Sequence, residues 1–227
     1  MTGKQKNLKF INPDNPESDL ILEAANIIKQ GGVIVFPTRG LYGIGADALN
    51  LKAVQRVFEI KQRPLNKPVS VLINDLKDLD RLAVNVPDTA KLLMDQFWPG
   101  KLTIILQAKK GIPENLIAGS GKIGIRLSAH KAACAIISSI SGPLTGTSAN
   151  ISGLAGCSSI KALDPLILDQ VDLVLDAGCL QGGTGSSVID VTLNPPVVLR
   201  EGEISAKKIL QIIDPGRDNL LTKDSYI

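Results

Sequence analysis

Apolar positions along the 227-residue chain recur in two alternating patterns, one helical and one extended. Between Pro16 and Gln30 they return every three or four residues, which predicts a helix that Gly31 ends. Val33–Phe36 is continuously apolar and predicts a buried strand. The same patterns predict helices from Leu51 to Lys61 and over Pro87–Phe97, His130–Ile140 and Ile204–Ile213, and strands over Val69–Ile73, Leu102–Gln107, Ile123–Leu127, Pro143–Gly146, Val171–Leu175, Ser187–Val191 and Val197–Arg200. Alternation of this kind is typical of an α/β fold with a mixed or parallel sheet.

Three segments break the alternation. Lys109–Lys122 is rich in glycine and polar residues, so we expect a mobile loop there. Lys161–Gln170 has a helical pattern that Pro165 interrupts. Asp214–Ile227 predicts a frayed tail, so residues 1–213 form a single domain and residues 214–227 a C-terminal tail.

The composition is that of an ordinary globular protein, with 44% apolar and 21% charged residues. Aromatic residues are only 3%, so the core is aliphatic and few rings can stack on nucleic acid bases. No apolar run approaches the roughly 18 residues of a membrane span, and the polar start from Met1 to Lys9 lacks the core of a signal peptide. We therefore expect a cytoplasmic protein without a membrane partner. Its three cysteines, Cys134, Cys157 and Cys179, are widely spaced and predict buried, reduced thiols.

Cations gather directly after the second predicted helix. Lys61 and Arg63 lie two residues apart, and Pro64 biases Arg63 toward an extended backbone, in which both side chains would project the same way. A guanidinium fork beside a mobile ammonium suits a polyphosphate, and Lys67 adds a third cation. A solvated basic loop would explain this segment equally well.

Small polar residues and glycines form two further segments, Thr145–Gly153 and Gly182–Ser187. Such segments form anion-binding backbone nests or simply tight turns. Ser148 and Asn150 lie in the first segment.

Three other cations lie on or beside predicted strands. Lys122 and Arg126 are four residues apart and therefore share one face of a strand, and Arg200 ends the last strand. Ordinary ion pairs would account for each of these residues.

Familiar catalytic patterns are missing from the sequence. The glycines of Pro37–Gly45 match neither G-x-G-x-x-G nor a P-loop, although Thr38 and Tyr42 offer hydroxyls there. No G-x-S-x-G elbow occurs, and the lone His130 with scattered cysteines does not make a transition-metal site. We assign His130 no role and expect no protein-built metal site.

Six ordered segments between Leu20 and Ser205 resemble the YrdC-domain family. They are the Pro-Thr-x-x-x-Tyr-Gly-x-Gly opening, Lys-x-Arg-Pro, Phe-Trp-Pro-Gly, Gly-Ile-Arg at the end of a strand, Ser-Ala-Asn-x-Ser-Gly, and Ser-Ser-Val-Ile-Asp leading to Leu-Arg. The resemblance implies a twisted mixed β-sheet flanked by helices around a concave basic cavity.

The bacterial members of that family are threonylcarbamoyl-AMP synthases, which make threonylcarbamoyl adenylate and pyrophosphate from L-threonine, bicarbonate and ATP for N6-threonylcarbamoyladenosine in tRNA. The resemblance implies Mg²⁺ with ATP, the later transfer machinery as partners, and a tRNA or double-stranded RNA contact. It gives the catalytic role to Lys61 and Arg63. The implied ATP site is Lys61, Arg63, Lys67, Ser148, Asn150 and Arg200, and the implied threonine site is Thr38, Lys122, Arg126 and Ser186.

The opening segment departs from the family, which usually has Pro-Thr-Glu-Thr or Pro-Thr-Asp-Thr where this chain has Arg39 and Gly40 in the last two places. The second threonine often contacts the amino acid, so this departure concerns the choice of amino acid. Two alternatives to the synthase therefore stay open. One is a non-catalytic RNA-binding paralogue, and the other is carbamoyl or adenylyl transfer to another acceptor.

Overall fold

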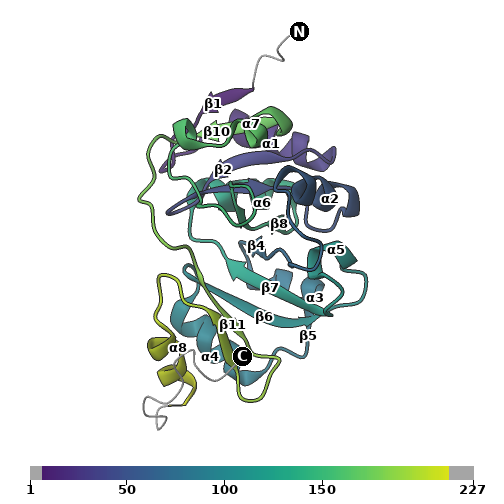
Figure 1. The fold of residues 1–227 in the computed structure, drawn as a ribbon, viewed down its shortest axis with the longest axis vertical. Coiled ribbons are helices and arrows are strands. Elements are labelled where there is room, and N and C mark those ends of the chain that lie inside the picture. Colours follow the sequence, from purple (N-terminus) through teal and green to yellow (C-terminus); the bar gives the residue numbers. More distant parts are fainter. Residues whose placement is uncertain (1–6, 215–227) are drawn as a thin grey trace.

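The computed structural model describes residues 7–214, whose strands form two sheets stacked along the long axis of the molecule (Figure 1). The upper sheet has the strand order β1-β10-β2-β3-β9. Its strands are β1 (Leu8–Phe10), β10 (Leu173–Asp176), β2 (Ile34–Pro37), β3 (Tyr42–Gly45) and β9 (Thr147–Ser148). The first three strands run parallel, and β2, β3 and β9 pair antiparallel.

The lower sheet has the order β12-β11-β6-β7-β4-β8, with β5 paired to β6. Its strands are β12 (Val197–Arg200), β11 (Ser187–Asp190), β6 (Leu102–Ala108), β7 (Lys122–Leu127), β4 (Val71–Ile73), β8 (Leu144–Thr145) and β5 (Ala83–Val84). Parallel and antiparallel pairs are mixed here too.

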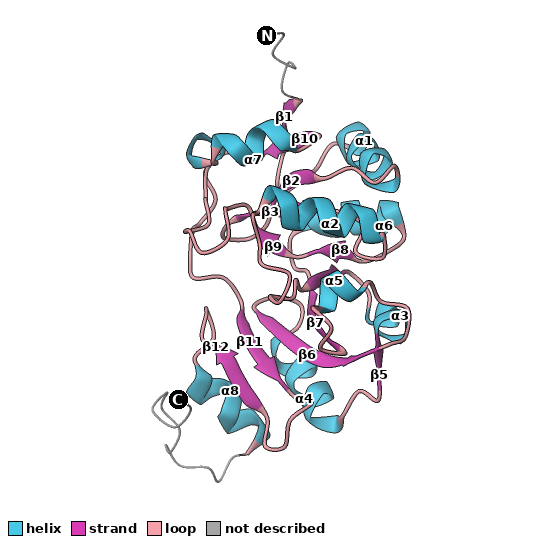
Figure 2. Cartoon of the chain, turned by 45° about the vertical axis from the view of Figure 1, so that its right-hand side comes forward, coloured by secondary structure: helices cyan, strands magenta, loops and turns pink. Residues whose placement is uncertain are grey.

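Helices cover both faces of the upper sheet, and most helices that pack on the lower sheet lie on one of its faces (Figure 2). They are α1 (Ser18–Lys29), α2 (Leu51–Ile60), α3 (Leu79–Leu82), α4 (Asp88–Phe97), α5 (Glu114–Ile117), α6 (Lys131–Ile140), α7 (Pro165–Gln170) and α8 (Ala206–Ile213), with single 3-10 turns at Leu76–Asp78 and Ile160–Ala162. In the upper sheet, Ile34 and Phe36 pack with α1 and α6, while Val33 and Val35 pack with α2 and α7. This alternation follows from the two-residue period of a strand.

The lower sheet uses the same period to separate a core face from a polar face. Ile123 and Ile125 of β7 pack into the core with α4 and α8, together with alternate residues of β6 and β11. Lys122, Gly124 and Arg126, which lie between and beside them, point to the opposite face and line a cavity. The face of the lower sheet opposite this core therefore carries polar groups, except at Leu72 of β4, which packs with α6.

The predicted α/β class with mixed sheets flanked by helices is confirmed, and most predicted elements are present within a few residues of their expected ends. The sequence patterns missed the short strands β1, β3, β5 and β9 and the short helix α3. The long strands confirm the predictions most closely, because β6 and β7 have clear two-residue patterns.

The segment predicted as a mobile loop is an exception. Residues 109–122 contain α5, whose Leu116 and Ile117 are buried, and the Leu116 carbonyl accepts a hydrogen bond from the Val69 amide. The prediction of a loop was wrong for Glu114–Ile117, because the glycines flank an apolar turn that packs into the core. Pro165 begins α7 rather than interrupting it, since proline fits the first turn of a helix. Except for Asp214, the predicted tail lies outside the described residues.

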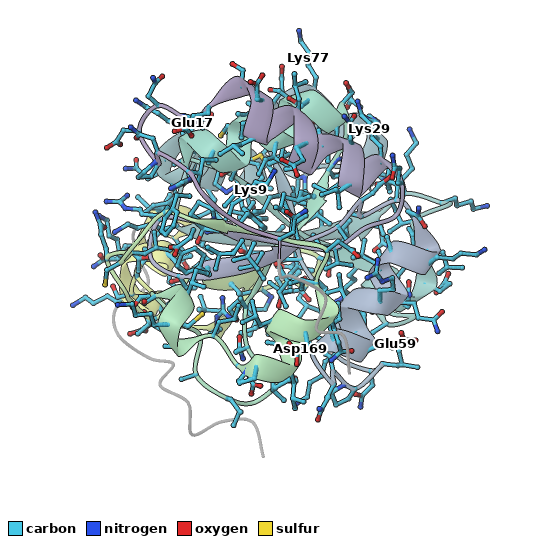
Figure 3. All side chains as sticks on the ribbon, turned by 90° about the horizontal axis from the view of Figure 1, so that it is seen from above. Lys9, Glu17, Lys29, Glu59, Lys77 and Asp169 are labelled. Atoms are coloured by element: carbon cyan, nitrogen blue, oxygen red, sulfur yellow. The ribbon has the colours of Figure 1, made fainter. Side chains whose placement is uncertain are left out.

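Charged side chains are distributed over the outside of the molecule (Figure 3), where Lys77 points away from the body. One surface ion pair joins Lys9 of β1 to Glu23 of α1. Within residues 7–214, no helix combines the length and apolar character needed to cross a lipid bilayer.

Candidate functional site

A cavity of about 790 Å³ lies between the open face of the lower sheet and the β2–β3 and β9 segments of the upper sheet. All ten side chains predicted as site residues line it, namely Thr38, Lys61, Arg63, Lys67, Lys122, Arg126, Ser148, Asn150, Ser186 and Arg200. They come from opposite halves of the chain. The fold therefore brings the predicted residues together, while their individual roles remain predictions.

Lys61 enters the cavity from the C-terminal end of α2 and is only 1% exposed. Its Nζ donates hydrogen bonds to the carbonyl oxygens of Ser148 (2.5 Å) and Asn150 (2.7 Å), which joins the two predicted signatures directly. Burial, reinforced by the positive charge of Arg63, lowers the pKa of Lys61 to about 7. Near neutral pH the buried Lys61 side chain can therefore exchange between its amine and ammonium forms.

The backbone between the two cations is not extended, which corrects the sequence interpretation. Lys61 has helical dihedral angles, and Gln62 is left-handed with a φ of 48°. The two side chains reach one cavity through a tight turn at the helix end, and not by alternation along a strand.

Arg63 holds the loop that follows it. Its Nε donates to the Lys67 carbonyl (2.9 Å) and its Nη2 to the Pro68 carbonyl (2.8 Å). Burial, and then the charge of Arg200, lower the pKa of Arg63. Lys67 itself is exposed. Arg63 thus both shapes the rim of the cavity and places positive charge near that of Arg200.

Ser148 and Asn150 form a closed local network. The Ser148 hydroxyl bonds the Asn150 side-chain oxygen, and the Asn150 amide donates to the carbonyls of Ile151 and Leu154. These bonds fix the turn whose carbonyls hold Lys61. The side chains of both residues line the cavity, although much of their hydrogen-bonding capacity is already used within the protein.

On the lower sheet, Lys122 is neutralised and Arg126 is not. Lys122 Nζ lies 2.9 Å from Oδ2 of Asp190, a carboxylate in the neighbouring strand β11. Burial alone would raise the pKa of Asp190, but hydrogen bonds from Thr192 and Lys122 outweigh it and lower that pKa. Arg126 has no hydrogen bond or ion pair among the described residues, which leaves it as the free cation of this face.

Arg126 lies deep in the site. Its burial and the nearby Arg200 lower its pKa to about 10, and the charge of Glu203 opposes that shift. A guanidinium of this pKa keeps its charge at neutral pH and is poorly compensated by the protein. It is therefore a strong counter-charge for a buried anion.

Ser186 and Arg200 touch each other, although the resemblance assigned them to different ligands. Arg200 Nη2 donates to the Ser186 carbonyl (2.6 Å) and Nε donates to the same oxygen (3.1 Å). The Ser186 hydroxyl bonds the Thr103 hydroxyl at 2.9 Å. If both assignments are correct, this pair marks the junction of the nucleotide and amino-acid parts.

The two residues that depart from the family pattern lie at the mouth of the cavity. Arg39 is exposed and also lines a second, smaller cavity beside Lys208. Gly40 lies against the Gly182 loop, where a Cβ on residue 40 would be 2.4 Å from the Gly182 carbonyl oxygen. The Gly182 amide donates to the Gly40 carbonyl (2.9 Å), so backbone occupies the space that a side chain would need.

The hydroxyls of the opening segment are less available than the sequence suggested. Tyr42 is fully buried, and its hydroxyl donates to the Gly178 carbonyl (2.8 Å) and accepts from the Ala177 amide (2.9 Å). The Thr38 hydroxyl donates to the Leu41 carbonyl (2.5 Å). Tyr42 therefore supports the loop and does not offer its hydroxyl to a ligand.

Sequence reasoning missed four residues of the site. Lys101 and Glu203 form an ion pair with an Nζ–Oε2 distance of 2.5 Å, and Asp190 and His130 also line the cavity. Asp190 belongs to the Ser-Ser-Val-Ile-Asp segment, which was the signal that could have found it. No comparable pattern in the sequence pointed to His130.

The charge of the cavity indicates an anionic ligand. Eight cationic side chains and two carboxylates line it, and each carboxylate is already paired with a lysine. Within residues 7–214, no three His, Cys, Asp or Glu side chains lie where they could share a metal ion.

The three cysteines are free, as expected. Only Cys157 is buried, however, whereas Cys134 is partly exposed and Cys179 is exposed. The prediction of three buried thiols is wrong for Cys179, which lies in the connection between β10 and β11.

Comparison with known proteins gives relatives over most of the chain. The family model named for Sua5, YciO and YrdC, described as "Telomere recombination", matches residues 26–202. The threonylcarbamoyl-AMP synthase of Pyrococcus abyssi is 35% identical over 190 residues, which are 84% of this chain and 56% of that protein. The chain therefore spans little more than half the length of this relative.

Two solved structures share the fold. The crystal structure of P. abyssi Sua5 complexed with L-threonine has a TM-score of 0.84 at 33% identity, over 91% of this chain and 61% of that one. Escherichia coli YciO has a TM-score of 0.82 at 31% identity, over 90% of this chain and 100% of that one. Because the family model and these relatives cover the strands and loops that build the cavity, the chain belongs to the Sua5/YciO/YrdC family.

Proposed function

We propose that this protein is a threonylcarbamoyl-AMP synthase. The observation that carries the proposal is the convergence of the ten predicted residues on one basic cavity, with Lys61 bonded to the turn that holds Ser148 and Asn150. Relatives at about 35% identity bear that name, and one was solved with L-threonine bound.

The proposed reaction has two steps. The amino nitrogen of threonine attacks the carbon of bicarbonate, and the carbamate forms with loss of water. A carbamate oxygen then attacks the α-phosphorus of ATP and expels pyrophosphate. Because the carbamate is itself the nucleophile, the protein mainly has to hold anions in line and stabilise charge on the phosphates.

The proposal assigns the cations of the cavity to two ligands. Lys61, Arg63 and Lys67 on the loop after α2, with Arg200 facing Arg63, would bind the triphosphate. Arg126, which has no partner among the described residues, would bind the threonine carboxylate. Lys122 would act on the amino acid only together with Asp190, since the two are paired.

Mg²⁺ would arrive with ATP. The two carboxylates of the cavity are paired with lysines, so the phosphates are the better ligands for this hard cation. The same proposal includes activity in the cytoplasm and delivery of the adenylate to the machinery that modifies tRNA.

Pyrophosphate release tests the proposal. We expect release only when ATP, L-threonine and bicarbonate are all present, and release that ignores threonine would refute the function. Arg63→Ala should reduce turnover by about one to three orders of magnitude, as loss of a charge-stabilising donor does. Arg56→Ala is the matched control, because Arg56 pairs with Asp172 on the surface and does not line the cavity.

A second candidate, the same chemistry on another amino acid, is favoured by one observation. Backbone of the Gly182 loop fills the space beside Gly40, and Arg39 presents a guanidinium that has no partner among the described residues. A screen of the standard amino acids for pyrophosphate release separates the two candidates. Greater release with an amino acid other than threonine would favour the second.

A further inference from the structure

His130, to which the sequence analysis assigned no role, lines the cavity. It is the N-cap residue of α6, is partly buried, and lines the main cavity. Its backbone is fixed, because the His130 amide donates to the Ser128 hydroxyl (3.3 Å) and the Ser128 amide donates to the Ile73 carbonyl (2.8 Å). These bonds fix the backbone that carries the imidazole at the cavity lining.

The two nitrogens of this imidazole differ in their surroundings. Nδ1 is enclosed and has no hydrogen-bond partner. Nε2 makes no hydrogen bond among the described residues and is not enclosed, so it is the nitrogen that a ligand can reach. A buried N–H without an acceptor is costlier than a buried lone pair without a donor. The neutral tautomer with hydrogen on Nε2 is therefore favoured, and the ring offers the cavity a donor.

The surroundings also favour the neutral ring. Burial lowers the pKa of His130, and the charge of Asp14 on the neighbouring loop opposes that effect. Protonation would place a second N–H on the enclosed Nδ1, which has no acceptor. At neutral pH the ring is thus an uncharged hydrogen-bond donor.

The position of His130 relative to Arg126 indicates what it would bind. The two residues are four apart in the sequence, with Arg126 in β7 and His130 at the N-terminal end of α6, and both line the cavity. Four residues of chain place their Cα atoms at most about 14 Å apart. They can therefore contact the same small ligand.

We propose that His130 is a substrate-binding residue, which donates its Nε2–H to an oxygen of a carboxyl-type anion held between it and Arg126. Two sources have this chemistry, namely the carboxylate of the amino acid and the bicarbonate ion. The inference rests on the proposed function for these two ligands, and it adds an uncharged imidazole donor beside the cation Arg126.

The test uses the fact that the sequence contains one histidine, so the imidazole signals of tag-free, ¹⁵N-labelled protein need no assignment. A long-range proton–nitrogen spectrum at neutral pH should show the Nε2–H tautomer. Separate titrations with L-threonine, bicarbonate and ATP identify the ligand. A shift of the ring signals with threonine or with bicarbonate supports the inference and says which anion is bound. An Nδ1–H tautomer, no shift with either anion, or a shift with ATP alone would overturn it.

Two variants extend the test to turnover. His130→Ala should raise the KM for the anion identified by the titration by roughly tenfold, while the KM for ATP stays unchanged, because only one neutral hydrogen bond is lost. His130→Gln, whose amide nitrogen can take the place of Nε2, should restore most of the loss. Equal KM values for His130→Ala and the unmodified protein would contradict the inference. The titrations need no turnover, so failure of the synthase reaction would not be mistaken for failure of the His130 site.

Discussion

Binding of ATP should draw a proton from solution onto Lys61. The pKa of this buried lysine is about 7, so roughly half of the molecules carry the ammonium at pH 7 and about one tenth at pH 8. A triphosphate beside Nζ favours the charged form and raises the pKa. Uptake on binding Mg·ATP should therefore approach about 0.9 proton per site at pH 8 and about 0.5 at pH 7.

Calorimetry measures this uptake directly. The binding enthalpy is recorded at pH 8 in buffers that differ in ionisation enthalpy. The slope of the binding enthalpy plotted against the ionisation enthalpy of the buffer is the number of protons exchanged. Mg·ATP is fully ionised at this pH, so the ligand itself contributes little to the slope. A slope near zero for the unmodified protein would refute the assignment of Lys61 to the phosphates.

Two variants control the experiment. Lys61→Arg keeps a permanent positive charge and should bind with no uptake, since a guanidinium stays protonated. Lys67→Met removes an exposed cation from the same segment and should keep the full uptake even if affinity falls. An equal slope in Lys61→Arg and the unmodified protein would mean that another group takes up the proton.

Three further predictions concern stability. Gly40→Ala should lower the free energy of unfolding by about 1–3 kcal/mol in a denaturant titration, because the new Cβ would meet the Gly182 carbonyl. Gly142→Ala is the control and should have little effect in the same titration, because a Cβ there meets nothing closer than 3.9 Å. Ser187→Ala should lower the free energy of unfolding by about 2 kcal/mol or more. The buried Ser187 hydroxyl donates to the Ile204 carbonyl and accepts from the amides of Gly202 and Ile204. An unchanged denaturation midpoint would contradict this prediction. The pKa of Lys61 is about 7 in the folded chain and about 10.4 in the unfolded chain. Between pH 7 and pH 10 the unfolded chain therefore binds more protons, and the free energy of unfolding should rise with pH over this range. In Lys61→Met this rise should shrink, which thermal unfolding at pH 7 and pH 9 would show.

Hydrophobic periodicity is strong enough in this sequence to determine the long elements. The two-residue pattern of β7 predicted both the strand and the shared face of Lys122 and Arg126, because side chains of a strand alternate by geometry alone. The three- and four-residue spacing of the first helix was equally informative.

The short strands could not be predicted in this way. β3 lies in a glycine-rich stretch that has no strand propensity of its own, and it forms because β2 and β9 pair with it on either side. Gly43 and Gly45 are needed there because the Phe36 ring lies where their Cβ atoms would be, at 3.1 Å and 2.9 Å. A turn and a strand are indistinguishable at this point until the neighbouring strands are known.

The sequence by itself indicated ten residues that line the cavity, because charge, hydroxyl groups and ordered spacing are local properties. Only the tertiary structure decided the state of those residues. It buried Lys61 and so lowered its pKa, paired Lys122 with Asp190 while leaving Arg126 without a partner among the described residues, and enclosed Nδ1 of His130 without a hydrogen-bond partner. Desolvation and pairing depend on groups that are distant in the chain, so no local pattern records them.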